Sequence, residues 1–334
     1  MSWNTEEEPK ENVISGKMTV NILYHDNCFD GAASAAVFHR FYLEKVNPEA
    51  KCILQGMTHQ AGRQFHDGLF RGDENAIVDF KYANTDRLTW WFDHHYSAFL
   101  TPEDEQHFLR DRSRRKFYDP TFKSCTKFIA TVTRKEFGFE CPMLEDLVRW
   151  ADIIDGAQYE SAEDAVEVRE PAQKLAAVIE ASKTPGSLQQ IIRQLAFQPL
   201  QEVASQQAVL EGYAPLAERH AQSIQMIRSN SSFDGEVIYF DLTRYDLDGH
   251  NKFIPYYLYP EANYSVSLLH TPTRMKVSAG WNPWSRRERR HNLAKICERY
   301  GGGGHPVVAA ISFPPDAVEK AREAAQSIAK ELSG

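Results

Sequence analysis

Short apolar runs alternate with polar or helical stretches between residues 18 and 92, and this alternation restricts the fold more than any other feature. The run from Met18 to Tyr24 is rich in β-branched residues and predicts a strand, and the Ala-rich segment 31–42 predicts the helix after it. Further apolar runs lie at 52–57, 76–80 and 88–92. Strands separated by crossovers are typical of a parallel sheet, so we predict an α/β fold, completed by helices at 125–137 and 143–154.

The rest of the chain divides into a helical stretch and a second α/β region. Residues 160–228 show almost no strand pattern and are rich in good helix formers. Strand patterns return at 236–242, 264–270, 275–279 and 307–313, and helix patterns lie at 292–300 and 316–332. We therefore predict a disordered leader at 1–17, a parallel-sheet domain at 18–158, a helical connector at 159–230 and a smaller α/β domain at 231–334.

Composition narrows the partners and the compartment. The chain has 38 Lys and Arg residues against 46 Asp and Glu residues, a net charge of -8, so a long nucleic-acid duplex is not favoured as a partner. Its five cysteines form no Cys-x-x-Cys pair, which argues against a zinc knuckle or a disulfide framework and favours the cytoplasm. No apolar run approaches the roughly 18 residues of a membrane helix, so we expect no membrane partner.

Polar side chains follow three of the predicted strands at their carboxyl ends. His25 and Asp30 lie in the turn after the first strand, where Gly31 permits a tight approach. Asp79 ends a later run, and Asp93–His95 ends the run after that. Each acid alone could cap a helix, and adjacent histidines often bond to a loop. Because ligands bind at the carboxyl ends of strands in open α/β sheets, three such ends in succession instead predict a metal and substrate site.

Four motifs in sequence order carry a resemblance to a known family. They are an acid-Gly turn with a following serine (Asp30, Gly31, Ser34), the strand-end Asp79, the triplet Asp93–His95 and the loop 301–306 of four glycines, His and Pro. Together they resemble the DHH phosphoesterase superfamily over essentially the whole folded chain, in particular its oligoribonuclease-like and adenosine-bisphosphate-phosphatase-like members.

The resemblance implies an architecture and a chemistry. A DHH domain is joined by helices to a DHH-associated domain that carries the glycine-rich loop. Members hydrolyse phosphate esters or anhydrides, including short oligonucleotides, adenosine bisphosphate, cyclic dinucleotides and polyphosphate, usually with Mn²⁺ or Mg²⁺. Dimers are common among them, so a homodimer is one option for this chain.

The resemblance also implies metal ligands. It assigns Asp30, Asp79 and His94 to the metal, with Asp79 bridging two ions. His25 lies one residue closer to Asp30 than in the common spacing, and we take it as an additional ligand. Oxygen ligands mixed with imidazole suit ions such as Mn²⁺, and paired ions about 3.5–4 Å apart can activate a bridging water.

Three further positions follow from the same motifs. The fourth family motif is an acid after a helical stretch, which fits Asp152, with Asp155 as the rival; we prefer Asp152. His95 resembles the family position that faces the substrate phosphate, and Asp93 would orient its neighbours. We therefore take His95 and Asp93 as the catalytic pair.

One position departs from the family pattern. Many members carry a second ligating Asp two residues before the equivalent of Asp30, whereas this chain has Cys28. A neutral thiol is a poor ligand for Mg²⁺ or Mn²⁺, so one metal site could be weaker, could recruit Asp26 or could be absent. Cys28 could equally be a buried, inert thiol, which is the interpretation that the sequence favours.

Two segments of the second α/β region suit an anionic ligand. A glycine-rich backbone approaches phosphate oxygens closely, and an imidazole adds a donor. The loop residues that we expect to hold substrate are Gly302, Gly303, Gly304 and His305. Segment 281–291 places two tryptophans among four arginines, so Trp281 and Arg286 are candidates for stacking on a base and holding a phosphate, unless the run is only a solvated face. The basic cluster at 110–116 is interpreted as solvated surface.

These observations predict a two-domain hydrolase. One or two Mn²⁺ or Mg²⁺ ions at the sheet rim would activate water for attack on a phosphate ester of a short oligonucleotide or nucleotide. Inorganic polyphosphate or another phosphoanhydride is the alternative substrate. A different class of function is also open, namely a nucleotide-binding regulatory protein whose catalysis is weakened by Cys28.

Overall fold

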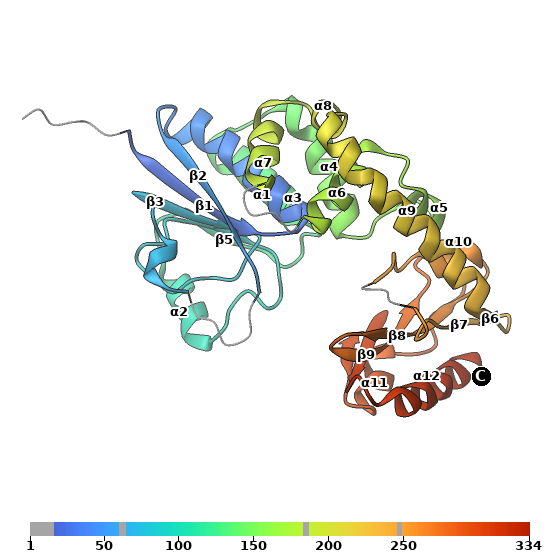
Figure 1. The fold of residues 1–334 in the computed structure, drawn as a ribbon. Coiled ribbons are helices and arrows are strands. Elements are labelled where there is room, and N and C mark those ends of the chain that lie inside the picture. Colours follow the sequence, from blue (N-terminus) through green and yellow to red (C-terminus); the bar gives the residue numbers. More distant parts are fainter. Residues whose placement is uncertain (1–16, 60–64, 183–186, 246–248) are drawn as a thin grey trace, which may run out of the picture. The chain divides into compact units, whose positions relative to one another are not determined.

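The computed structural model describes residues 17–59, 65–182, 187–245 and 249–334 (Figure 1). These residues form two compact units. The first unit runs to Ala157 and includes Ile179–Val203, and the second unit contains Gln158–Val178 and Ala204–Gly334. The predicted leader at 1–17 lies, apart from Lys17, outside the described residues. Helices of the predicted connector at 159–230 are divided between the two units.

The first unit contains a parallel sheet, as predicted. Its strands are β1 (Thr19–His25), β2 (Lys51–Met57), β3 (Glu74–Val78), β4 (Trp90–Asp93) and β5 (Lys116–Tyr118). They pair in the order β2-β1-β3-β4-β5, and every pairing is parallel. The first four correspond to the predicted runs. β5 was not predicted, because it has three residues and lies in the basic segment that we assigned to surface.

Helices cover both faces of this sheet. They are α1 (Phe29–Phe41), α2 (Pro102–Arg110), α3 (Cys125–Phe137), α4 (Glu145–Asp155), α7 (Ser187–Phe197) and α8 (Leu200–Ala204), with short turns at Tyr42–Val46, Asp67–Leu69 and Pro142–Leu144. α1 is buried along almost its whole length and contacts α3, α4 and α7. Its four alanines between positions 32 and 36 allow this close packing.

The aromatic residues of β4 anchor the site end of the sheet. Their side chains alternate between the faces, as strand geometry requires. Trp90 packs against Phe38 and Phe41 of α1, whereas Trp91 packs against Phe108 of α2. Both indoles are at most 1% exposed. Because β4 is held from both sides, the residues just after it have a fixed position.

The second unit contains a mixed six-stranded sheet. Its strands are β6 (Ser231–Phe233), β7 (Val237–Asp241), β8 (Tyr264–Thr271), β9 (Arg274–Trp281), β10 (Gly303–His305) and β11 (Val308–Phe313). The order is β10-β11-β9-β8-β7-β6, and only the β7–β8 pair is parallel among the strands of the described residues. The predicted glycine loop is therefore partly an edge strand, β10.

Helices complete the second unit. They are α5 (Ala162–Glu167), α6 (Pro171–Ala181), which crosses the boundary between the units, α9 (Gln207–Asn230), α10 (Ile254–Leu258), α11 (Leu293–Glu298) and α12 (Val318–Ser333). α11 and α12 bury apolar side chains against the sheet, including Leu293, Ile296 and Ile328. The mixed α/β class predicted for the chain is confirmed. No helix within the described ranges has the length and apolar character needed to cross a membrane.

Candidate metal centre

The candidate site lies where three adjacent strands of the first unit end. β1, β3 and β4 are neighbours in the sheet and run in the same direction, so their carboxyl ends meet at one edge. His25 is the last residue of β1, Asp79 directly follows β3, and His94 directly follows β4. The first turn of α1 adds Asp30, and the last residue of α4 is Asp155. The sequence prediction that strand-end residues converge is therefore met by His25, Asp30, Asp79 and His94.

Asp79 occupies the centre of this group. Its carboxylate is 1% exposed and lies 3.4 Å from His25 Nδ1 through Oδ2, and 3.5 Å from His94 Nε2 through Oδ1. Its backbone has a φ of 55°, a left-handed conformation that is uncommon outside glycine. The Asp79 amide donates to the Phe92 carbonyl at 3.0 Å, which fixes this turn. Such strained backbone occurs where a side chain must be aimed at a functional site.

Several buried polar atoms of the site have no hydrogen-bond partner among the described residues. They are both carboxylate oxygens of Asp79, Nδ1 of His25 and Nε2 of His94. Buried oxygen and nitrogen atoms are normally satisfied, and a bound ion is one explanation when they are not. A carboxylate and two imidazoles with free lone pairs are suitable ligands for a divalent cation. The residues present therefore fit a metal ion.

His94 connects Asp79 with two further carboxylates. Its Nε2 lies 3.7 Å from Asp30 Oδ2 and 3.6 Å from Asp155 Oδ2. Nδ1 of His94 lies 3.1 Å from the Phe122 carbonyl, which suits an Nδ1–H donor and leaves Nε2 facing the acids. A bond of this kind fixes the ring orientation of metal-binding histidines.

Asp30 has a second task in the fold. It is 2% exposed, and its two carboxylate oxygens accept the amides of Cys125 at 2.7 Å and Thr126 at 3.0 Å. Asp30 therefore holds the amino terminus of α3 while Oδ2 also faces His94. A carboxylate at a helix amino terminus gains from the orphan N–H groups there.

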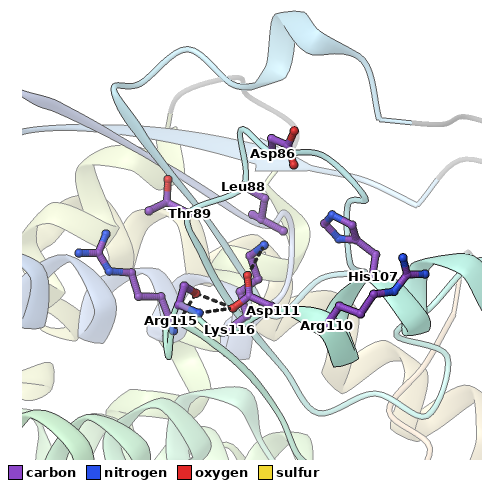
Figure 2. A pocket seen from close by; sticks show the side chains of 9 residues that line it. Asp86, Leu88, Thr89, His107, Arg110, Asp111, Arg115 and Lys116 are labelled. Carbon is purple, nitrogen blue, oxygen red and sulfur yellow. Dashed lines mark hydrogen bonds and ion pairs between the residues drawn. The ribbon is translucent and has the colours of Figure 1, made fainter.

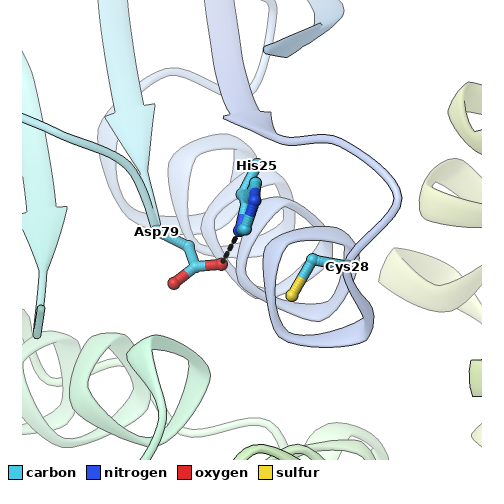
Figure 3. A group of neighbouring side chains, drawn as sticks. All are labelled: His25, Cys28 and Asp79. Carbon is cyan, nitrogen blue, oxygen red and sulfur yellow. Dashed lines mark ion pairs between the residues drawn. The ribbon is translucent and has the colours of Figure 1, made fainter. Parts of the chain in front are cut away.

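The ligand atoms form three overlapping groups in the described part of the chain. They are His25–Cys28–Asp79, Asp79–His94–His95 and Asp30–His94–Asp155, and the ligand atoms within each group lie within 4.8 Å of one another. Figure 3 shows the first group, whose side chains point toward one another from the ends of β1 and β3 and the start of α1. Asp79 and His94 each belong to two groups, so the arrangement suits two neighbouring ions.

Asp155, and not Asp152, is a member of these groups. The two acids lie three residues apart, on nearly the same face of α4 but about one turn from each other. Asp152 Oδ1 accepts a hydrogen bond from Ser124 Oγ at 3.2 Å, and Asp152 belongs to none of the three groups found in the described residues. Sequence spacing gives no basis for this choice, because it depends on how far α4 reaches over the rim. The geometry favours the rival that we ranked second.

Asp93 and His95 form a separate pair beside the metal groups. His95 Nδ1 lies 2.7 Å from Asp93 Oδ1, and the same oxygen accepts the backbone amides of His94 and His95 at 2.8 and 3.3 Å. Asp93 is fully buried, whereas the His95 side chain is 39% exposed. The bond to Asp93 raises the pKa of His95. Asp93 thus orients the triplet, and His95 presents an imidazole to solvent.

The acids of the site repel one another without a cation. Burial and the charges of Asp79 and Asp155 raise the pKa of Asp30 well above its usual value. Burial and the Asp79 charge likewise raise the pKa of Asp155 to about 6. Burial would lower the pKa of His94, but Asp79 and Asp30 outweigh it and raise that pKa to about 10. A protonated His94 thus partly compensates the negative charge of these acids.

Cys28 belongs to the site, whereas Asp26 does not. Cys28 is half-buried, and burial together with the carboxylates of Asp79 and Asp30 raises the pKa of its thiol. The Asp26 side chain covers Gly56 of β2, where an added Cβ would lie 2.5 Å from Asp26 Cγ. Asp26 is also absent from the three ligand groups of the described chain. The geometry therefore gives no support to recruitment of Asp26.

His59 is a site neighbour that the sequence analysis missed. It follows β2, which runs parallel to β1 and ends at the same edge of the sheet. Its ring stacks on Phe80 with 4.4 Å between centroids and meets the edge of His25 at 4.8 Å. The available signal was its position two residues after a predicted strand, the same signal that identified the other strand-end residues.

The predicted substrate loop lies in the second unit. Gly303 and His305 are exposed. An added Cβ at Gly302 would lie 2.4 Å from the Ala310 carbonyl oxygen, and one at Gly304 would lie 2.5 Å from the Val308 oxygen. These two glycines are therefore required by the pairing of β10 with β11. Gly303 has no atom within 4 Å of such a Cβ, so packing does not explain it and its backbone is open to a ligand.

The tryptophan-arginine segment is partly built into the second unit. Trp284 donates to the Tyr159 carbonyl at 3.0 Å and packs against Phe253. Arg287 and Arg290 both pair with Glu236, at 2.7 and 2.8 Å. Trp281 is half-buried against the core, and Arg286 is exposed. Trp281 and Arg286, the two residues chosen from the sequence, thus stay candidates for substrate contact.

Three basic residues of the cluster at 110–116 line a cavity of about 590 Å³ in the first unit, namely Arg110, Arg115 and Lys116 (Figure 2). Lys116 pairs with Asp111 at 3.0 Å, and its side chain is 6% exposed. Arg115 pairs with Glu74 at 2.9 Å. The prediction of a solvated surface is therefore wrong for Lys116, which its place in β5 buries. The charges of Arg115 and Lys116 are thus paired with acids within the fold.

Comparison with known proteins identifies the fold. No family model and no curated protein sequence matches the chain. Solved structures do match it. The pGpG-specific phosphodiesterase PggH of Vibrio cholerae has a TM-score of 0.66 and 17% identity, over 94% of this chain and 99% of that chain. A DHH-domain protein described as a member of the s1p family of ribosomal proteins has a TM-score of 0.57 and 15% identity, over 94% and 87%.

RecJ of Thermus thermophilus, solved with Mn²⁺, matches at a TM-score of 0.52 and 12% identity, over 94% of this chain and 52% of RecJ. These proteins are members of the DHH superfamily. The chain therefore shares the fold of these proteins, with a parallel-sheet unit and a second α/β unit, and this agrees with the fold that the resemblance implied. A fold at this level of identity does not define a substrate, which must be argued from the site.

Proposed function

We propose that the protein is a metal-dependent phosphoesterase that hydrolyses phosphate esters of short oligonucleotides or nucleotides. The observation that carries the proposal is the rim of the first unit, where three carboxylates and two imidazoles converge. Among them, the Asp79 carboxylate, His25 Nδ1 and His94 Nε2 have no hydrogen-bond partner in the described residues. The likeness to a pGpG phosphodiesterase and to RecJ supports a phosphoesterase. The acidic charge of the chain supports a short substrate over a long polymer.

The proposed ligands are His25, Asp79, Asp30, His94 and Asp155, with Asp155 in the place first given to Asp152. Asp79 would be shared by two ions, because it faces both His25 and His94. Divalent ions bound here, which we propose to be Mn²⁺ or Mg²⁺, supply a water activated for in-line attack and neutralise charge on the phosphoryl group. Asp93 and the carbonyl of Phe122 hold the histidines in place.

Residues outside the ligand groups would bind the substrate. His95, oriented by Asp93, would present its outer nitrogen to a phosphate oxygen as a proton donor. In the second unit, the open backbone at Gly303 and the exposed His305 would hold a further phosphate. Arg286 and Trp281 would contact the nucleotide.

The test is phosphate or nucleotide release by the purified chain. Short oligoribonucleotides, a linear dinucleotide, adenosine bisphosphate and polyphosphate would be compared with and without Mn²⁺. We expect Mn²⁺-dependent turnover of a nucleotide, lost in Asp79→Asn. Preferred turnover of polyphosphate would move the function to phosphoanhydride hydrolysis. Nucleotide binding without any turnover would favour the regulatory protein and would contradict the proposal.

Two further points belong to the same proposal. We place the protein in the cytoplasm, supported by five cysteines that are all free. A homodimer is the proposed assembly, by likeness to the family, and light scattering of the purified chain would measure it. A monomeric mass at micromolar concentration would refute the dimer and leave the catalytic proposal intact.

A further inference from the structure

We propose that Cys28 is a metal ligand, and that with His25 and Asp79 it forms a site that prefers borderline ions such as Zn²⁺ or Co²⁺ to Mn²⁺ or Mg²⁺. The inference rests on the metal site of the proposed function and specifies one half of it. The group Asp30, His94 and Asp155, which offers only oxygen and nitrogen, keeps the preference for harder ions. The two halves of the centre therefore differ in the ion that they select.

The geometry of the group suits a compact cation. The ligand atoms of His25, Cys28 and Asp79 lie within 4.8 Å of one another, and His25 Nδ1 is 3.4 Å from Asp79 Oδ2. Ligands held at about 2.0–2.3 Å around a tetrahedral Zn²⁺ are roughly 3.3–3.8 Å apart. The imidazole and the carboxylate already have this spacing. In Figure 3 the Cys28 sulfur points into the space that these two groups share.

The local backbone explains how the sulfur reaches the site. Cys28 precedes α1 with extended angles, φ −130° and ψ 133°, and its side chain does not cap the helix. It stands instead at the amino terminus of a 13-residue helix, beside the ligand atoms of His25 and Asp79. The other two ligands are available to an ion. The carboxylate oxygens of Asp79, which is 1% exposed, and His25 Nδ1 have no hydrogen bond among the described residues.

The chemistry follows from the donor set. Binding of the ion to sulfur expels the thiol proton to solvent, so the ligand carries one negative charge, as an aspartate would. Compared with an aspartate at this position, the thiolate keeps the charge of the site but supplies a softer ligand atom. Thiolate and imidazole suit Zn²⁺ and Co²⁺, whereas Mg²⁺ and Mn²⁺ prefer oxygen ligands. If Cys28 were only an inert, buried thiol, its substitution would leave the metal-ion preference of the centre unchanged.

The first experiment is spectroscopic and independent of catalysis. The full chain is stripped of metal with a chelator, kept reduced with a phosphine and titrated with Co²⁺. Cobalt bound by a thiolate absorbs in the near ultraviolet through sulfur-to-metal charge transfer, which oxygen and nitrogen ligands do not give. We expect this band in the wild type and in the control Cys141→Ser, which removes another half-buried free cysteine. We expect its loss in Cys28→Ser.

The second experiment measures preference. In Cys28→Asp we expect the ratio of Mn²⁺ to Zn²⁺ affinity to rise at least tenfold, by calorimetric titration of each ion. Circular dichroism checks that both variants fold. No band in the wild type, a band that persists in Cys28→Ser, or an unchanged ratio in Cys28→Asp would each overturn the proposal. A wild-type band without phosphate release would refute the phosphoesterase and leave the thiolate ligand standing.

Discussion

Replacing Asp155 and Asp152 separately by Asn tests the most specific feature of the proposed centre. Asp155 Oδ2 lies 3.6 Å from His94 Nε2 and belongs to a ligand group, whereas Asp152 Oδ1 accepts from Ser124. Asn has nearly the shape of Asp but carries no charge. The two variants therefore remove one negative charge each from positions one turn apart on the same helix. Either one serves as the matched control of the other.

The expected magnitudes differ clearly. Groups that only support a metal ligand cost about 10–100-fold in metal affinity when removed, so loss of the Asp155 carboxylate should cost at least that, roughly 1.4–2.7 kcal/mol. The Asn amide oxygen at position 152 can still accept from Ser124 Oγ. Asp152→Asn should therefore change metal affinity by less than about threefold, or within ~0.7 kcal/mol.

Metal affinity would be measured by calorimetric titration of the chelator-treated protein with Mn²⁺. Thermal unfolding with and without Mn²⁺ gives a second readout, because an ion that binds only the folded state stabilises it. A large loss of affinity in Asp152→Asn together with wild-type affinity in Asp155→Asn would refute the assignment. It would also restore the choice made from the sequence.

Four further predictions follow from the contacts. In the metal-free protein, the pKa of His94 is raised to about 10, so a bound ion must displace its proton. The affinity for Mn²⁺ should therefore rise by up to about tenfold per pH unit between pH 7 and 9. An affinity that does not change over this range would contradict a protonated His94. Protonated His94 also stabilises the metal-free fold, fully below pH 6.5 and decreasingly as the pH approaches 10, which urea unfolding with chelator present would detect. Asp30→Ala removes the acceptor of two buried amides, which should destabilise the first unit by about 2–4 kcal/mol in urea unfolding. The range allows for relief of the charge repulsion among the acids, which offsets part of the loss. Wild-type stability would show that these two hydrogen bonds are unimportant. Gly303→Ala should fold normally and raise the KM for a nucleotide substrate. Gly302→Ala should instead lower the Tm, because its Cβ would meet the Ala310 carbonyl. Equal effects of the two substitutions on Tm would refute the distinction.

The sequence predicted those parts of the site that follow strands. Runs such as Trp90–Phe92 are apolar because both faces of the sheet are covered, and a polar residue directly after such a run must lie at the sheet edge. His25, Asp79 and His94 were found by this rule. Parallel pairing then brings the three ends together without any further information.

Other features depend on tertiary placement. The reach of α4 decides between Asp152 and Asp155, and two acids on one face of a helix look alike in sequence. β5 escaped prediction because its residues Lys116–Tyr118 show no apolar alternation and pair only through the edge of β4. β10 consists of glycines and one histidine, which predict a loop until the pairing with β11 is known. The role of Cys28 likewise depends on where its sulfur points.

The double duty of Asp30 makes the occupancy of the centre visible at a distance. The same carboxylate faces His94 and holds the first two amides of α3. Coordination of an ion by this carboxylate would therefore change the strength of its hydrogen bonds to those two amides. Deuterium exchange at Cys125 and Thr126 would therefore register the loading state of the protein with no substrate, dye or added label.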